Sequence, residues 1–220
     1  MAYEKLFNEI YAALSLKYLW QEYRPSFIKS ESPDWINEEM ELGLEVSQAL
    51  LPDDGQTKNF IEKYLGCLRE ELPEVMVERY GDRLYFYNGR FWAVLPDESK
   101  EQDYIYKAEY RFREKLEKLN TNYQRRRYNG LYLFLHPLNE YEIDAGELFL
   151  TMQQIQENRR QQFHWVFLNC RSKIYICNYL EDVFQEIELP QNSADFLNKE
   201  TERLRQSIVW KKGASIEMGS

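Results

Sequence analysis

The chain has 220 residues, of which 28 are basic and 37 acidic, and its net charge is −9. A hydrophobic fraction of 44%, with 15% aromatic residues, excludes overall disorder and is enough to build a sizeable core. We find no signal peptide and no apolar run of the roughly 18 residues that span a membrane, and the three cysteines lack metal-finger spacing, so we expect a cytoplasmic protein without a membrane partner. The negative charge excludes attraction of nucleic acid by the overall field, so such binding requires a local basic patch.

An amphipathic helix is predicted first, over residues 3–23. Apolar side chains recur there at helical spacing, and Pro25 ends the helix because the residue before a proline is pushed out of the helical region.

A strand hairpin follows. Pro33 fixes the backbone entering Asp34, Trp35-Ile36 has strand composition, and the polar residues 37–39 form a turn. In the next strand Leu42, Leu44 and Val46 alternate with polar or small residues, so one face lies on a core. Asp34 begins one strand and Glu45 lies in its partner, so the turn brings two carboxylates together. Two carboxylates are a typical protein contribution to a Mg²⁺ site.

The pair Pro33-Asp34 and the run Glu45-Val46-Ser47 resemble the PD-(D/E)xK nuclease superfamily, which includes the restriction endonucleases. A helix before, a helix after and apolar strands later are similar to its α-β-β-β-α-β order. The resemblance implies hydrolysis of DNA with Mg²⁺ or Mn²⁺, held by Asp34, Glu45 and the backbone carbonyl of Val46. It also implies a glutamate from the first helix, for which Glu9 and Glu22 are the candidates. We favour Glu22 because it is closer to Asp34 in the sequence.

The family lysine is missing from its usual position, where this chain has Ser47. Serine carries no charge and cannot stabilise the negative charge that develops during phosphodiester cleavage. The family sometimes moves this lysine to the following helix, which offers Lys58 and Lys63. We favour Lys58 as the catalytic lysine because it borders the apolar face of a helix predicted over residues 57–71.

The middle of the chain holds a hairpin and a long helix. Two aromatic strands over residues 83–95 surround Asn88-Gly89, the strongest short hairpin signal, and we read them as an insertion. Their aromatic side chains either stack on bases or form a small core of their own. The helix spans residues 104–123. From Lys107 to Arg127 there are eight basic residues and three acidic ones, an excess that suits either phosphate contact or a solvated helix end. The predicted nucleic-acid contacts are Lys118, Arg125, Arg126 and Arg127.

The remaining elements complete a sheet. Residues 131–135 are almost entirely apolar, which predicts a strand buried on both faces. A helix over residues 145–159, a hairpin over residues 163–179 and a helix from Ser193 follow.

These patterns predict a single α/β domain over residues 1–210, with a mixed central sheet flanked by helices. It is restriction-endonuclease-like, carries a hairpin-plus-helix insertion at about residues 72–130, and ends in a flexible tail over residues 211–220. Two functions stay open. One is a Mg²⁺-dependent nuclease acting on DNA through Asp34, Glu45 and Lys58. The alternative is a catalytically inactive relative that acts as a binding or defence-associated interaction protein, which Ser47 and the acidic charge favour.

Overall fold

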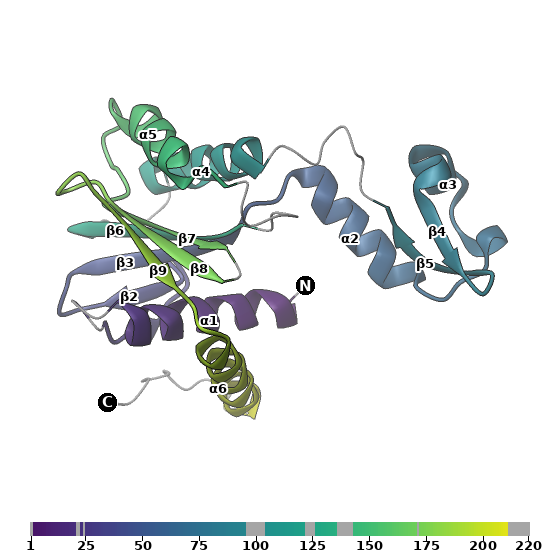
Figure 1. Cartoon of the computed structure of the whole chain (residues 1–220), viewed down its shortest axis with the longest axis horizontal. Helices are drawn as coiled ribbons and strands as arrows, with labels where there is room; N and C mark the ends of the chain where they lie inside the picture. The colour runs from purple at the N-terminus through teal and green to yellow at the C-terminus, as the bar shows by residue number, and fades with distance from the viewer. Residues whose placement is uncertain are drawn as a thin grey trace. The chain divides into compact units, whose positions relative to one another are not determined.

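The computed structural model in Figure 1 describes residues 2–20, 23, 25–95, 104–121, 126–135, 143–170 and 172–210. The chain divides into two compact units. The first comprises Met1–Ala49 and Ala108–Ser220, and the second comprises Leu50–Lys107.

A seven-stranded mixed sheet forms the centre of the first unit, in the order β1-β2-β3-β6-β7-β8-β9. The first three strands pair antiparallel, β3, β6 and β7 pair parallel, and β7, β8 and β9 pair antiparallel. The strands are β1 (Ile28–Lys29), β2 (Trp35–Asn37), β3 (Leu42–Gln48), β6 (Tyr128–Phe134), β7 (Trp165–Cys170), β8 (Lys173–Asn178) and β9 (Val183–Glu188). The predicted α/β class with a mixed central sheet is therefore confirmed.

Helices cover both faces of this sheet. Figure 1 shows α1 (Ala2–Leu19) and α6 (Gln191–Trp210) below it, and α4 (Tyr104–Thr121) and α5 (Ala145–Gln156) above it. Leu42, Leu44 and Val46 lie in one core cluster with the buried side chains of α1, so the opposite face of β3 carries Gly43, Glu45 and Ser47. Strand β6 is almost entirely buried, which explains its continuous apolar sequence.

The second unit has a small core of its own. It contains α2 (Pro52–Tyr64), α3 (Glu74–Tyr80) and a hairpin of β4 (Leu84–Tyr87) with β5 (Arg90–Val94). Asn88 and Gly89 both have positive φ, as the predicted Asn-Gly turn requires. The buried side chains are Phe60, Leu72, Tyr80, Leu84 and Phe91. The hairpin thus contributes to a local core, while Tyr85, Tyr87 and Trp92 are exposed.

Several boundaries differ from the sequence prediction. The insertion expected at about residues 72–130 does not coincide with the second unit, which starts at Leu50 and ends at Lys107. Helix α2 therefore belongs to the second unit, whereas most of α4 belongs to the first. Strands β1 and β9 and helix α3 were not predicted, and residues 211–220 lie outside the described residues. No helix in the described part of the chain combines the length and apolarity that a membrane crossing needs.

Candidate functional site

Asp34 and Glu45 lie on neighbouring strands. Trp35 of β2 pairs with Leu44 of β3, so the antiparallel register brings Asp34 opposite Glu45. The carboxylate Oδ2 of Asp34 accepts a hydrogen bond from the backbone N–H of Val46 at 2.8 Å. Both acidic residues are buried, with exposed fractions of 5% and 7%. The carboxylate of Asp34 therefore lies beside the peptide bond that joins Glu45 to Val46.

A third buried carboxylate comes from the first helix. Glu9 is 4% exposed, and its backbone carbonyl accepts a hydrogen bond from the indole Nε1 of Trp35 at 2.8 Å, which fixes α1 against β2. Burial raises the pKa of Asp34, and the adjacent negative charge of Glu9 raises it further, while the Val46 N–H and Lys29 oppose this shift. Glu9 is thus the first-helix glutamate next to Asp34. Glu22, the favoured candidate, lies outside the described residues.

Lysines accompany each of these carboxylates. Lys29 Nζ lies 2.9 Å from Glu9 Oε2 and donates a hydrogen bond to the backbone carbonyl of Asp34 at 3.0 Å. Lys5 Nζ lies 3.4 Å from Glu9 and 3.9 Å from Asp34. Lys115 on α4 forms an ion pair with Glu45. These cations offset part of the cost of removing three carboxylates from water.

Lys115 is the cation that sequence reasoning missed. It follows the buried Phe112 by three positions and precedes the buried Leu119 by four, so it shares their helical stripe. A lysine within an apolar stripe was the available signal, but α4 was assigned to the insertion. The predicted Lys58 lies on α2 in the second unit, and its role stays a prediction.

Gly43 permits a close approach beside the site. A Cβ at this position would lie 2.7 Å from Cγ of Pro33 and 3.2 Å from Cγ of Arg126. Pro33, Gly43 and Glu45 line one narrow crevice together with Asn129. Glu9 and Asp34 line a separate pocket of about 490 Å³, which also contains Lys5 and Lys29. The three carboxylates thus border two hollows.

The implied metal ion requires a group of oxygen ligands. Among the residues that the structure describes, no three His, Cys, Asp or Glu side chains are grouped so as to hold a metal ion. Mg²⁺ needs fewer protein ligands, because it keeps several waters and is often held by one or two carboxylates. Asp34 and Glu45 are hard oxygen donors opposite each other on adjacent strands, and their sharing of a cation stays a prediction. The role of the Val46 carbonyl stays a prediction.

The predicted basic contacts are engaged in ion pairs. Arg126 pairs with Glu38 at 3.0 Å, Arg127 with Glu41 at 3.2 Å, and Lys118 with Glu114 at 2.7 Å. Arg125 lies outside the described residues. Arg126 and Arg127 nevertheless line a common pocket with Arg160, a residue that the sequence did not single out.

Comparison with known proteins finds no match to this chain among family models, curated proteins or solved structures. A function for this chain therefore rests on the geometry of its buried carboxylates and lysines.

Proposed function

We propose that this chain is a Mg²⁺- or Mn²⁺-dependent nuclease of the PD-(D/E)xK type that hydrolyses phosphodiester bonds in DNA. The observation that carries the proposal is the hydrogen bond from the Val46 N–H to Asp34, which joins the start of β2 to the residue after Glu45. When the second unit is left out, the first unit has the order α1-β1-β2-β3-α4-β6, with β6 parallel to β3. This order supports the proposal because it is similar to the α-β-β-β-α-β order of that superfamily.

Asp34 and Glu45 hold the metal ion in this proposal, and the Val46 carbonyl adds a backbone oxygen. A bound Mg²⁺ supplies charge stabilisation and a more acidic water. Glu9 orients water or completes the ligand set from α1. Lys115 replaces the family lysine, whose position is occupied by Ser47 in this chain. Its ammonium group contacts Glu45 and can stabilise negative charge that develops on a phosphate.

Two observations favour the alternative, an inactive relative that acts as a binding or defence-associated interaction protein. A lysine lies within 4 Å of each of the three buried carboxylates, so these lysines compensate part of their charge without a metal ion. Ser47 also leaves β3 without a cation at the usual position. Both proposals keep the cytoplasmic location expected from the sequence.

A cleavage assay separates the two. Supercoiled and single-stranded DNA are incubated with the purified protein in Mg²⁺, in Mn²⁺ and in EDTA. We expect cleavage only with a metal ion, and a loss on the order of 10²-fold or more in Asp34→Asn and Glu45→Gln. Glu186→Gln is the matched control because Glu186 lies on β9, at the far edge of the sheet, and pairs with Lys173 at the surface. Its activity should equal that of the wild type.

Comparison of two lysine variants identifies the catalytic lysine. We expect Lys115→Ala to slow cleavage by roughly 10² to 10³-fold, by analogy with loss of another charge-stabilising group, and Lys58→Ala to cleave normally. The reverse result would return the role to Lys58. Absence of cleavage by the wild type, with a melting temperature that responds to neither metal ion, would establish the inactive relative instead.

A further inference from the structure

A pocket rich in arginine lies where β6 and β7 begin. Its volume is about 320 Å³, and we call it the arginine pocket; it is lined by Arg126, Arg127, Arg160, Asn129, His164 and two glutamines. Tyr128 starts β6 and Trp165 starts β7, so the pocket lies at the end of the sheet where these parallel strands start. Among the described residues, no Asp or Glu lines it. A chain with a net charge of −9 thus has a pocket lined by three arginines, two of which are paired with glutamates outside its lining.

The three arginines can exchange their present contacts for an anion. Arg160 is exposed and has no ion pair or hydrogen bond with any residue that the structure describes. Arg126 and Arg127 pair with Glu38 and Glu41, whose side chains are 63% and 57% exposed. Exposed pairs of this kind contribute little free energy. Each pair engages one nitrogen of a guanidinium that carries five N–H donors in a fork suited to phosphate.

His164 adds a neutral donor to the pocket. Its Nδ1 accepts a hydrogen bond from the backbone N–H of Asn129 at 2.9 Å. The neutral ring therefore carries its proton on Nε2, which can donate. The lining combines cationic forks with a neutral N–H donor, a combination that matches the oxygens of a phosphate group.

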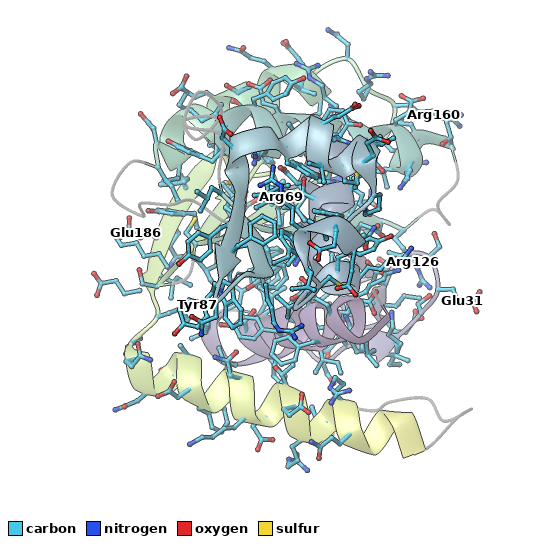
Figure 2. All side chains as sticks on the ribbon, turned by 90° about the vertical axis from the view of Figure 1, so that its right-hand side faces the viewer. Glu31, Arg69, Tyr87, Arg126, Arg160 and Glu186 are labelled. Atoms are coloured by element: carbon cyan, nitrogen blue, oxygen red, sulfur yellow. The ribbon has the colours of Figure 1, made fainter. Side chains whose placement is uncertain are left out.

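The arginine pocket borders the carboxylate site. Asn129 lines both this pocket and the crevice that contains Glu45. The Cγ of Arg126 lies against Gly43, which precedes Glu45 by two positions on the same strand face. Gly43 and Glu45 are therefore about 7 Å apart along β3. Two nucleotides of a strand, at about 3.4 Å each, span a similar length. Figure 2 shows Arg126 and Arg160 on the same side of the molecule.

We propose that the arginine pocket binds a backbone phosphate of a nucleic-acid strand that passes beside Glu45. The identity of the ligand rests on the proposed function, whereas the pocket itself does not. Binding there positions the strand without reading its sequence, because phosphate contacts carry no base information.

Binding of an oligonucleotide in EDTA tests the proposal without any cleavage. Fluorescence anisotropy of a labelled single-stranded 20-mer is measured for the wild type, Arg160→Ala and Arg159→Ala. Arg159 is the matched control because it is adjacent and exposed but pairs with Glu117 and does not line the pocket. We expect Arg160→Ala to weaken binding by roughly 5- to 10-fold and Arg159→Ala by less than about twofold. The salt slope should fall by about 0.7 in Arg160→Ala alone.

A second test uses a variant that should bind the oligonucleotide more tightly than the wild type. Glu38→Gln removes the carboxylate that competes for Arg126, so oligonucleotide binding should tighten, by roughly twofold to fivefold. Glu186→Gln, which removes the same charge at the other edge of the sheet, should have a smaller effect.

The outcomes separate this inference from the nuclease proposal. Equal effects of Arg160→Ala and Arg159→Ala would overturn the phosphate site. Binding of inorganic phosphate or ADP that depends on Arg160, without binding of the 20-mer, would overturn the assignment to a strand. Oligonucleotide binding that depends on Arg160 supports the pocket even if Mg²⁺-dependent cleavage is absent.

Discussion

Lys115 on α4 forms an ion pair with Glu45 on β3, although seventy positions separate them in the sequence. Their side chains are 11% and 9% exposed, so neither charge is well hydrated. Loss of one partner leaves the other as a buried, uncompensated charge, which costs several kcal/mol. The pair therefore joins α4 to β3, and each of the two charges is compensated by the other.

Replacing this lysine should destabilise the first unit. We expect Lys115→Met to lower the free energy of unfolding by about 3 kcal/mol, measured by urea denaturation. Lys118→Met, which breaks a more exposed pair with Glu114, should cost less than about 1 kcal/mol. Adding Glu45→Gln to Lys115→Met should restore much of the loss because it removes the unpaired charge. Equal costs for the two lysine variants would show that the Glu45 pair is no stronger than a surface contact.

Asp34 should make the protein less stable as the pH rises. Burial and the charge of Glu9 raise the pKa of Asp34, so the folded state holds this proton more tightly than the unfolded state. The stabilising contribution is complete below the ordinary value of about 3.9 and is lost as the pH rises through the raised pKa. Asp34→Asn should therefore gain thermal midpoint relative to the wild type between pH 4 and pH 7 in EDTA.

Glu114 serves as a control because its pKa shift, and therefore its effect on the pH dependence of stability, has the opposite sign to that of Asp34. Burial opposes the shift, but the hydrogen bond from Lys118 and the charge of Arg111 lower the pKa of Glu114. Its contribution is present above the ordinary carboxyl pKa and is lost as the pH falls, so Glu114→Gln should lose thermal midpoint relative to the wild type as the pH rises. Parallel trends in the two variants would contradict the assignment for Asp34.

An added methyl group at Gly43 should disturb the entry to β2. The new Cβ would meet Pro33 at 2.7 Å, and the proline ring can yield only by moving the backbone that leads to Asp34. We expect Gly43→Ala to cost about 1–3 kcal/mol in chemical denaturation. Gly55→Ala on α2 is the control, because its Cβ would meet nothing within 4 Å, and it should gain about 0.5–1 kcal/mol. A neutral result at Gly43 would show that Pro33 relaxes freely.

His164 should titrate below an ordinary histidine. Burial lowers its pKa, so its contribution to stability is present above about 6.5 and is lost as the pH falls through the lowered pKa. The chain has two histidines, so the ring resonance that disappears in His164→Asn is assigned to His164. Its midpoint in an NMR titration should lie below the ordinary value of about 6.5. The asparagine oxygen can still accept from the Asn129 N–H, so the variant should fold. A pKa at or above 6.5 would contradict the burial of this ring.

The local elements were predictable because their periodicity is strong. The alternation of Leu42, Leu44 and Val46 predicted which face of β3 packs on the core. The pair Asn88-Gly89 predicted the turn between β4 and β5. Strand β9 was missed because it is an exposed edge strand with polar side chains such as Gln185 and Glu186, which weaken the apolar signal. The seven residues of α3 are too few for a clear helical repeat.

The candidate site was predictable only where its parts are close in sequence. Asp34 and Glu45 share one hairpin, so turn chemistry alone predicted their pairing. Lys115 reaches Glu45 through tertiary packing of α4, and Arg160 joins Arg126 because β6 and β7 pair in parallel. The apolar stripe of α4 marks Lys115 as a largely buried lysine, but nothing local identifies Glu45 as its partner or places Arg160 near Arg126.

The ion pair between Asp54 and Lys107, at 3.0 Å, bears on how the sheet assembles. These residues lie close to the two ends of the second unit, which interrupts the connection from β3 to β6. If this segment were unfolded, parallel pairing of Leu42 with Tyr128 would require closure of a long loop, which is entropically costly and slow. Folding of the second unit brings Asp54 and Lys107 together and leaves the span that contains most of α4 to close. Folding of the second unit first would therefore lower the entropic cost of closing the connection between β3 and β6.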